Sequence, residues 1–259
     1  MTGGQPILPG ERTAVITGAG GPRGIGRALA VRLADQGWSL AVLDVQGDGV
    51  DRLRRELADA GHSSVLALQA DVTSPESVEA AFSEIDAQLP PVAGLANLAG
   101  IASPVRLLDV THEEFRRVVD VNVTGSFLML RAAGRRMVDH GVGRIVNTSS
   151  LTAFDGGGTF SKGPYAAAKA GVLGLTRGAA RELGPHGVTV NAVAPGPVDT
   201  DIMGGRLTDE RKEAMAADIP VGSVASPEEV AASIAFLMSQ EACSINGATL
   251  QIDGGKHMH

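Results

Sequence analysis

Two side chains that could exchange a proton stand four positions apart in the second half of the chain. Tyr165 and Lys169 lie in a segment with helical spacing, so both are expected on one face of a helix. Tyr165 is the single tyrosine of the sequence. A cation beside a phenol favours the phenolate, so Lys169 is expected to lower the pKa of Tyr165 from about 10 and to make it a general acid or base near neutral pH. Because the same spacing is common on solvated helices, the pair needs support from other features.

A glycine-rich stretch near the N-terminus supplies the first such feature. The apolar run from Ala14 to Ile16 predicts a buried strand, and apolar residues with helical spacing resume at Ile25. A strand, a glycine turn and a helix in this order bring backbone N–H groups to the positive end of a helix dipole, which is a site for a pyrophosphate. A plain turn is the alternative. The glycines of the turn are Gly18, Gly20, Gly21, Gly24 and Gly26.

An acidic residue follows at the spacing that a bound adenosine ribose requires. Asp44 ends the second predicted strand, roughly 20 residues after the glycine turn. A carboxylate there can accept hydrogen bonds from both ribose hydroxyls. The alternative is an aspartate that only caps the next helix.

Composition limits the classes of protein that remain. The chain has 259 residues, of which 44% are hydrophobic, and this fits a single domain over residues 12–259 after a loose tail at 1–11. The net charge of −7 argues against nucleic acid or an anionic membrane as a partner. No apolar run is long enough to cross a bilayer, and the histidines show no metal-ligand spacing, so no metal is expected. The single cysteine, Cys243, excludes an internal disulfide and fits a reducing cytoplasm.

Strands and helices alternate along the chain, and most strands are continuous apolar runs. This pattern predicts an α/β fold, a single Rossmann-type doubly wound parallel sheet of about seven strands with helices on both faces. Ligands of such folds bind at the carboxyl ends of the strands. Strands are expected near 14–16, 38–43, 65–69, 93–97, 144–147, 188–193 and 248–252, and helices near 25–34, 47–60, 75–88, 111–139, 165–183, 207–217 and 227–238.

Together these motifs resemble the short-chain dehydrogenase/reductases. The resemblance runs in the family's order over almost the whole chain. It rests on TGAGGPRGIG from Thr17, Asp71-Val72, NLAG from Asn97, VNVTG from Val121, NTSS from Asn147, YAAAK from Tyr165 and APGPVDT from Ala194.

The resemblance implies a catalytic set of four residues. Tyr165 matches the general acid/base, and Lys169 matches the lysine that lowers its pKa and holds the nicotinamide ribose. Ser150, rather than Ser149, matches the serine that binds the substrate carbonyl. Asn122 matches the asparagine that supports a proton-relay water.

The resemblance also implies a set of nicotinamide cofactor contacts. These are Gly18, Gly20, Arg23, Gly24, Ile25, Asp44, Val45, Asp71, Val72, Asn97, Ala99, Gly100, Tyr165, Lys169, Pro195, Gly196, Val198 and Thr200.

The sequence departs from the family pattern in the glycine turn. The turn carries two more residues before Gly24 than the family motif, so Gly21-Pro22 is expected to bulge outward. Arg23 resembles an arginine that favours the binding of NADP, but it could instead pair with Asp44 or stack on adenine. Asp44 favours NAD, and its effect on the choice of cofactor is expected to be stronger than that of Arg23.

The leading interpretation is an NAD-dependent oxidoreductase of a secondary alcohol or ketone. One alternative is an NADPH-dependent 3-oxoacyl-thioester reductase, and another is a nucleotide-binding regulator without catalysis, which the intact set of four residues argues against.

Substrate is expected to contact residues 105–108, the loop after Ser150 and a covering segment at about 201–220. The resemblance further implies a homotetramer, with the helices from Thr111 and Tyr165 at one interface and the last strand at another.

Overall fold

The computed structural model describes residues 6–158, 161–203, 205 and 207–258. Residues 1–5 of the expected tail, Phe160 in the loop after Ser150, and positions 204 and 206 of the expected covering segment lie outside the described residues. The described part of the tail is not loose. Leu8 donates a backbone hydrogen bond to Gln240, and Gln240 donates one to the carbonyl of Pro6.

One parallel sheet organises the chain, as the alternating pattern predicts. Its strands run in the order β3-β2-β1-β4-β5-β6-β7, and every neighbouring pair is parallel. The order reverses between β1 and β4, so the carboxyl ends of these two strands define the crevice in which such sheets bind ligands. The strands are β1 (Thr13–Thr17), β2 (Ser39–Asp44), β3 (Val65–Gln69), β4 (Val92–Asn97), β5 (Gly143–Thr148), β6 (Val188–Pro195) and β7 (Thr249–Ile252).

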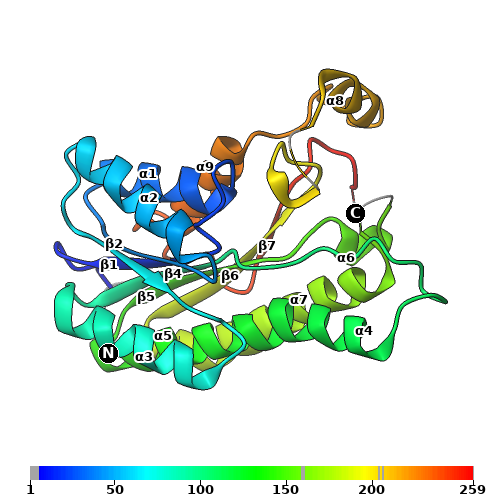
Figure 1. Ribbon diagram of the computed structural model, residues 1–259. Coiled ribbons are helices and arrows are strands. Elements are labelled where there is room, and N and C mark those ends of the chain that lie inside the picture. Colours follow the sequence, from blue (N-terminus) through cyan, green and yellow to red (C-terminus); the bar gives the residue numbers. More distant parts are fainter. Residues whose placement is uncertain (1–5, 159–160, 204, 206, 259) are drawn as a thin grey trace.

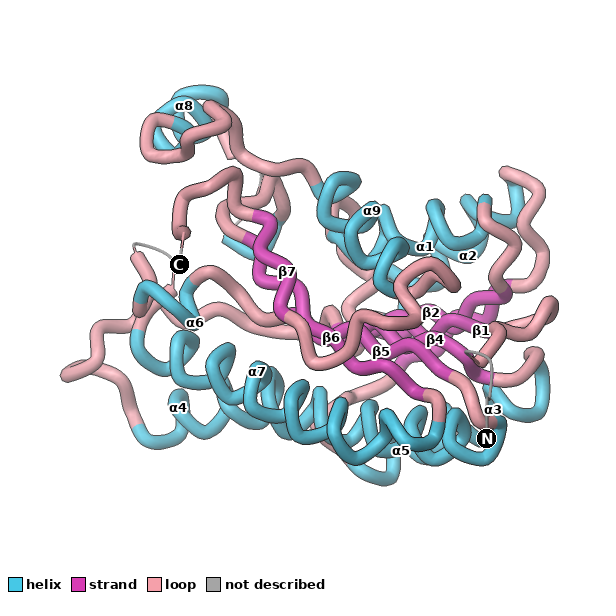
Figure 2. The backbone as a smooth tube through the Cα atoms, turned by 180° about the vertical axis from the view of Figure 1, so that it is seen from behind, coloured by secondary structure: helices cyan, strands magenta, loops and turns pink. Residues whose placement is uncertain are grey.

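Helices cover both faces of the sheet (Figure 1). One face carries α1 (Ile25–Asp35), α2 (Gly47–Asp59) and α9 (Pro227–Leu237), and the other carries α3 (Pro75–Gln88), α5 (Gly125–His140) and α7 (Gly163–Leu183). The view from behind shows the same two layers, with α8 (Asp209–Ala216) standing apart from the body (Figure 2). Each layer closes its own apolar core against the sheet.

The long helix expected from Thr111 is present but is not uniform. It begins as α4 (His112–Val119), widens into a π-helical turn, η1 (Asp120–Thr124), and continues as α5. Thr111 caps α4 by accepting a hydrogen bond from the backbone N–H of Glu114. Single π turns inside α-helices are frequent at functional sites, and this one carries Asn122.

Two other elements differ from the sequence-based expectation. The glycine-rich stretch after Ser150 contains a short helix, α6 (Thr152–Asp155), which a loop prediction missed. The sixth strand, expected near 188–193, extends two residues further to Pro195, which lies opposite Ile252 of β7. Two 3₁₀ turns complete the described elements, η2 (Gly184–His186) and η3 (Asp201–Met203).

A buried polar chain crosses the middle of the sheet. Asn97 at the end of β4 donates to the side-chain oxygen of Asn147 on β5 at 2.8 Å, and Asn147 donates to the hydroxyl of Thr176 on α7 at 3.0 Å. All three residues are buried. The chain therefore fixes β4, β5 and α7 relative to one another, directly below the carboxyl ends of the strands.

We predict that Asn147→Ala lowers the free energy of unfolding by about 2 kcal/mol, because it leaves buried polar groups of its two neighbours with fewer partners. Urea unfolding would measure the change. Ser64→Ala is the matched control, since it removes an exposed hydroxyl that bonds to Ser39 and should cost less than about 0.5 kcal/mol. Equal stability of the two variants would contradict this role for Asn147.

Candidate active site

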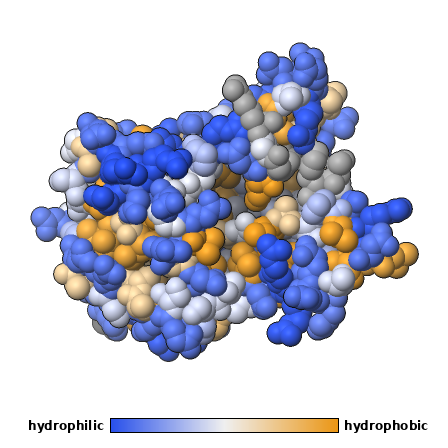
Figure 3. Space-filling view, in the orientation of Figure 1, coloured by the Kyte–Doolittle hydropathy of each residue, from blue (hydrophilic) through white to orange (hydrophobic). Residues whose placement is uncertain are grey.

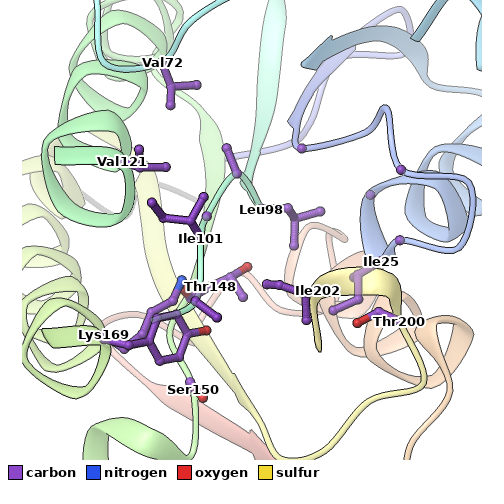
Figure 4. Close-up of a pocket in the computed structure, with 18 of the residues that line it drawn as sticks. Ile25, Val72, Leu98, Ile101, Val121, Thr148, Ser150, Lys169, Thr200 and Ile202 are labelled. Atoms are coloured by element: carbon purple, nitrogen blue, oxygen red, sulfur yellow. The ribbon is translucent and has the colours of Figure 1, made fainter. Parts of the chain in front are cut away.

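A cleft of about 990 Å³ lies at the carboxyl ends of β1, β4, β5 and β6. Its volume is at the upper end for small-molecule sites, so it has room for a dinucleotide together with a small substrate. Figure 3 shows apolar side chains gathered at a hollow on this side of the molecule, below α8. Figure 4 shows Lys169 and Ser150 at one end of the cleft and Val72 toward the other.

The glycine turn after β1 is built for close backbone approach. Gly18 has a positive φ of 68°, and a Cβ there would lie 2.8 Å from the backbone nitrogen of Ala99. Thr17 supports the same contact, because its hydroxyl accepts hydrogen bonds from the backbone N–H groups of Leu98 and Ala99, both at 3.0 Å. Thr17 was not singled out from the sequence, although its position at the end of β1 could have indicated it.

The N-terminus of α1 suits an anion. Its N-cap is Gly24, which offers no side-chain acceptor, and its first turn contains no acidic residue. By contrast, Ser74, Thr111, Thr208 and Ser226 cap α3, α4, α8 and α9 with side-chain hydrogen bonds. The first N–H groups of α1 therefore keep their capacity to bind a phosphate oxygen. This observation fits the pyrophosphate site that the sequence predicts.

The lengthened part of the turn forms a β-turn of its own. The backbone N–H of Gly24 donates to the carbonyl of Gly21 at 3.2 Å, with Pro22 at the second position, where its restricted φ is favourable. Gly21 lines the cleft, whereas Pro22 is exposed. The expected outward bulge is therefore present at Pro22 and Arg23.

The expected pairing of Arg23 with Asp44 was wrong, whereas its contact with cofactor stays a prediction. Arg23 is absent from the cleft lining among the described residues, and it pairs with Asp201 rather than with Asp44. The extra turn carries its side chain to Asp201, which lines the cleft in the segment that follows β6. Gly20 is also absent from the cleft lining among the described residues. Its backbone N–H donates to Asp44 at 2.8 Å, and a Cβ at Gly20 would collide with that carboxylate.

Asp44 lines the cleft at the end of β2. One carboxylate oxygen accepts from Gly20 and the other accepts from the backbone N–H of Gln46 at 3.0 Å. Because a carboxylate has about four acceptor positions, capacity remains for ribose hydroxyls. Asp44 thus holds two backbone N–H groups and has a position that suits a ribose. Val45, Asp71 and Val72 line the same end of the cleft.

The side chain of Asn97 does not line the cleft in the described part of the chain, and its contact with cofactor stays a prediction. Its side chain is buried and donates to Ser126 and Asn147, so it ties β4 to its neighbours. The turn that follows is different, because Ala99 and Gly100 do line the cleft.

Tyr165 and the two serines meet at the end of β5. A hydrogen bond joins the Tyr165 hydroxyl to the side chain of Ser150. Ser150 also accepts a hydrogen bond from the backbone N–H of Thr152 at 3.2 Å. Ser149 is buried instead, and its hydroxyl donates to the backbone carbonyl of Lys169 at 2.8 Å. The structure therefore gives the two serines different tasks, with Ser150 beside the tyrosine and Ser149 supporting α7.

Lys169 is buried, and its ammonium group donates to the carbonyl of Thr148 at 2.8 Å. Its Nζ lies 5.5 Å from the centroid of the Tyr165 ring. Asn122 holds itself in the π turn by donating to the carbonyls of Ile101 and Val118. Its Oδ1 is buried and has no hydrogen-bond partner among the described residues.

Gly100 separates that oxygen from the lysine. A Cβ at Gly100 would lie 2.7 Å from Asn122 Oδ1 and 3.4 Å from Lys169 Nζ. The missing side chain leaves space between an unpaired acceptor and an ammonium donor, which suits a bridging water. Asn122 itself is absent from the lining of the described cleft and lies behind Gly100.

The pKa of Tyr165 is shifted in the direction opposite to the sequence-based expectation. Burial raises it from 10.0 to about 12, and the Ser150 hydrogen bond lowers it only in part. Burial also lowers the pKa of Lys169 to about 8. Burial therefore disfavours the charged form of both side chains, the phenolate of Tyr165 and the ammonium of Lys169.

The remaining expected contacts follow β6. Pro195, Gly196, Val198 and Thr200 line the cleft, as do Gly18, Gly24 and Ile25 on the opposite side. Sequence reasoning missed several lining residues, among them Ile101 and Thr148. Thr148 could have been found as the residue that ends β5, whereas Ile101 lies in a loop without a distinctive pattern. Ile202 also lines the cleft, within the segment expected to cover the substrate. That these residues bind cofactor remains a prediction.

Comparisons with known proteins agree with this arrangement. A family model described as enoyl-(acyl carrier protein) reductase matches residues 18–257. A cis-4-hydroxycyclohexanecarboxylate dehydrogenase of Sinomonas cyclohexanicum is 44% identical, covering 95% of this chain and 96% of the relative. A 3-oxoacyl-[acyl-carrier-protein] reductase of Vibrio cholerae is 38% identical, covering 95% and 98%. A crystal structure of a short-chain type dehydrogenase/reductase from Mycobacterium marinum aligns with a TM-score of 0.89 at 33% identity, covering 97% of each chain.

The chain therefore belongs to the short-chain dehydrogenase/reductases. It is an oxidoreductase that acts on CH–OH or carbonyl groups with a nicotinamide cofactor. In the described part of the chain, no helix is long and apolar enough to span a membrane. No cluster of three or more potential metal ligands occurs among the described residues either.

The shifted pKa values predict a specific titration. Because Tyr165 is the single tyrosine, tyrosinate absorbance reports on it alone. In cofactor-free protein, absorbance should not develop between pH 7 and 10, since the pKa of Tyr165 is about 12. Saturating NAD⁺ brings a positive ring to the site and should move the onset to lower pH. Circular dichroism at each pH would verify that the fold persists. A midpoint below pH 10 without cofactor would contradict the dominance of burial.

Proposed function

We propose that this oxidoreductase uses NAD and transfers a hydride between it and a secondary alcohol or ketone, with Tyr165 as the general acid/base. The observation that carries the chemical part is the convergence of Tyr165, Ser150 and Lys169 at one end of the cleft. The bound nicotinamide ring supplies the hydride or accepts it. The residues of the chain position the substrate and move the proton.

The proton-transfer group is organised by its neighbours. In the reducing direction, the Tyr165 hydroxyl donates its proton to the substrate oxygen, and Ser150 donates a second hydrogen bond to that oxygen. A high pKa suits the donor role, because Tyr165 remains protonated at neutral pH. In the oxidising direction Tyr165 must accept a proton, which requires its pKa to fall when the positive nicotinamide is bound.

Lys169 and Asn122 provide a route for the proton behind Tyr165. Lys169 carries its charge at neutral pH despite burial, since its pKa is about 8. Its Nζ and the unpaired Oδ1 of Asn122 face the same space beside Gly100. A water in that space would accept a hydrogen bond from Lys169 and donate one to Asn122.

Asp44 supports the preference for NAD. Its carboxylate lines the cleft where the adenosine ribose of the cofactor is expected. A 2′-phosphate would add negative charge there, and like charges 4 Å apart at a surface-like dielectric repel by roughly 4 kcal/mol. Arg23 does not offset this charge, because it is engaged by Asp201. The same argument weighs against an NADPH-dependent 3-oxoacyl-thioester reductase, the alternative that the names of several relatives suggest.

We also propose that the protein works in the cytoplasm as a homotetramer. Phe115 of α4 and Phe127 of α5 are about 40% exposed, at 38% and 41%, and Leu250 on the edge strand β7 is 38% exposed. Partly exposed apolar side chains on the surfaces of these elements support subunit contacts there. The proposed substrate is a small alcohol or ketone that packs against the apolar lining near Ile101 and Ile202.

The central test is Tyr165→Phe. The ring still packs but cannot donate a proton, so turnover of a secondary alcohol with NAD should fall by about 10²–10⁴ while NADH binding, measured by fluorescence, is retained. Ser150→Ala should lower turnover severely and Ser149→Ala only mildly, because Ser150, and not Ser149, bonds to the Tyr165 hydroxyl. Activity of Tyr165→Phe within a few-fold of the wild type would refute the assignment, and the reverse order of the serine variants would exchange their roles.

The cofactor choice is tested by comparing kcat/KM for NAD and NADP. We predict a preference for NAD of about 10², and a smaller preference in Asp44→Ala because the repelling charge is removed. Asp51→Asn is the control, since it removes a negative charge from α2 outside the cleft lining. A wild-type enzyme that prefers NADP would place the 3-oxoacyl-thioester reductase first.

A further inference from the structure

Arg23 makes a two-point contact that bridges the cleft mouth. Its Nε donates to both carboxylate oxygens of Asp201, at 3.2 and 3.4 Å, and its Nη2 forms an ion pair with Oδ1. Paired N–H donors on one carboxylate give a more defined geometry than a single contact between point charges. The two side chains are 32% and 39% exposed, so the pair is open to solvent and ions.

Each member of the pair belongs to an element that lines the cleft. Arg23 stands in the β-turn that leads directly into Gly24 and the N-terminus of α1. Asp201 begins η3 and lines the cleft itself, as do its neighbours Thr200 and Ile202. Figure 4 shows Ile202 pointing into the cleft, between Ile25 and Thr148. The ion pair therefore joins the turn that leads into the phosphate site to the start of the covering segment.

The stem and far end of the covering segment are tied elsewhere. Its two stems meet at a β-bridge between Val198 and Ala225. Near its end, Val221 donates a backbone hydrogen bond to Gly254 of the C-terminal turn. In contrast to these backbone contacts, the tie between η3 and the glycine turn is made by two side chains. It can be removed by substitution without changing the backbone contacts of the stem.

We propose that Arg23 and Asp201 form a latch that holds η3 across the cleft and slows the release of the bound nicotinamide dinucleotide. Both are positioning residues, because they act through the placement of η3 and not on the reacting atoms. The two additional residues of the glycine turn give Arg23 the reach to Asp201. The latch rests on the nicotinamide cofactor of the proposed function but not on the choice of NAD.

The latch is tested first in cofactor-free protein by hydrogen exchange. Asp201→Asn and Arg23→Gln should each speed amide exchange in residues 201–203 about five-fold, as expected for loss of an exposed but well-oriented ion pair. The double variant should be no faster than either single variant, because both remove the same interaction. Glu213→Gln, which removes an acidic charge from α8 and leaves Arg23 paired, should match the wild type.

The second measurement is the rate of NADH release by stopped-flow fluorescence. Both single variants and the double variant should release NADH about five-fold faster, and added salt should narrow the difference from the wild type. Unchanged exchange and release in Asp201→Asn would overturn the latch. It would also be overturned if Arg23→Gln alone accelerated release, since Arg23 would then contact the cofactor directly. A wild type that does not bind NADH would refute the proposed function, while the exchange experiment would still decide whether the latch exists.

Discussion

The burial of the Lys169 ammonium is the constraint on which the site depends. In the described part of the chain its hydrogen-bond partner is a backbone carbonyl, that of Thr148, and not a carboxylate. A buried charge with so little compensation is costly, which lowers the pKa of Lys169 to about 8 yet leaves it charged at neutral pH. The surroundings must therefore hold the lysine in place. Ser149 fixes the backbone of α7 at Lys169, the end of β5 provides the acceptor, and the π turn brings the Asn122 oxygen to the far side of Gly100.

The two ends of the cleft use different physical means to prepare for the same ligand. At the phosphate end, side chains are missing where the ligand would approach. The N-cap of α1 is Gly24, which has no capping side chain, and Gly18 lets the backbone after β1 lie against the backbone at Ala99. At the reacting end, it consists of buried polar side chains in defined bonds. The Asn97–Asn147–Thr176 chain links β4, β5 and α7 beneath the reacting end. Because these side chains are buried, they hold the three elements together without occupying the cleft.

The sheet and its helices were predictable because their signals are local. Continuous apolar strands, capping residues such as Ser74 and the glycine turn each determine structure within a few residues. The family resemblance added the meeting of Ser150, Tyr165 and Lys169. Contacts between distant segments were not predictable in this way. Arg23 finds Asp201 across 178 positions, and Asn97 turns inward because Asn147 lies beside it in the sheet. The pKa of Tyr165 was misjudged because sequence spacing shows the neighbouring charge and not the depth of burial.

The bridge between Val198 and Ala225 has a consequence for how such an enzyme could change during evolution. By joining the two stems, it makes the intervening segment a closed loop whose ends are already paired. The entropy of closing a loop grows only slowly with its length, by about 0.6 kcal/mol for each doubling. Residues could therefore be inserted or exchanged beyond the bridge at small cost to the stability of the sheet. The scaffold that moves the hydride and the proton would remain intact, while the part of the pocket beyond the bridge diverged to accept other molecules.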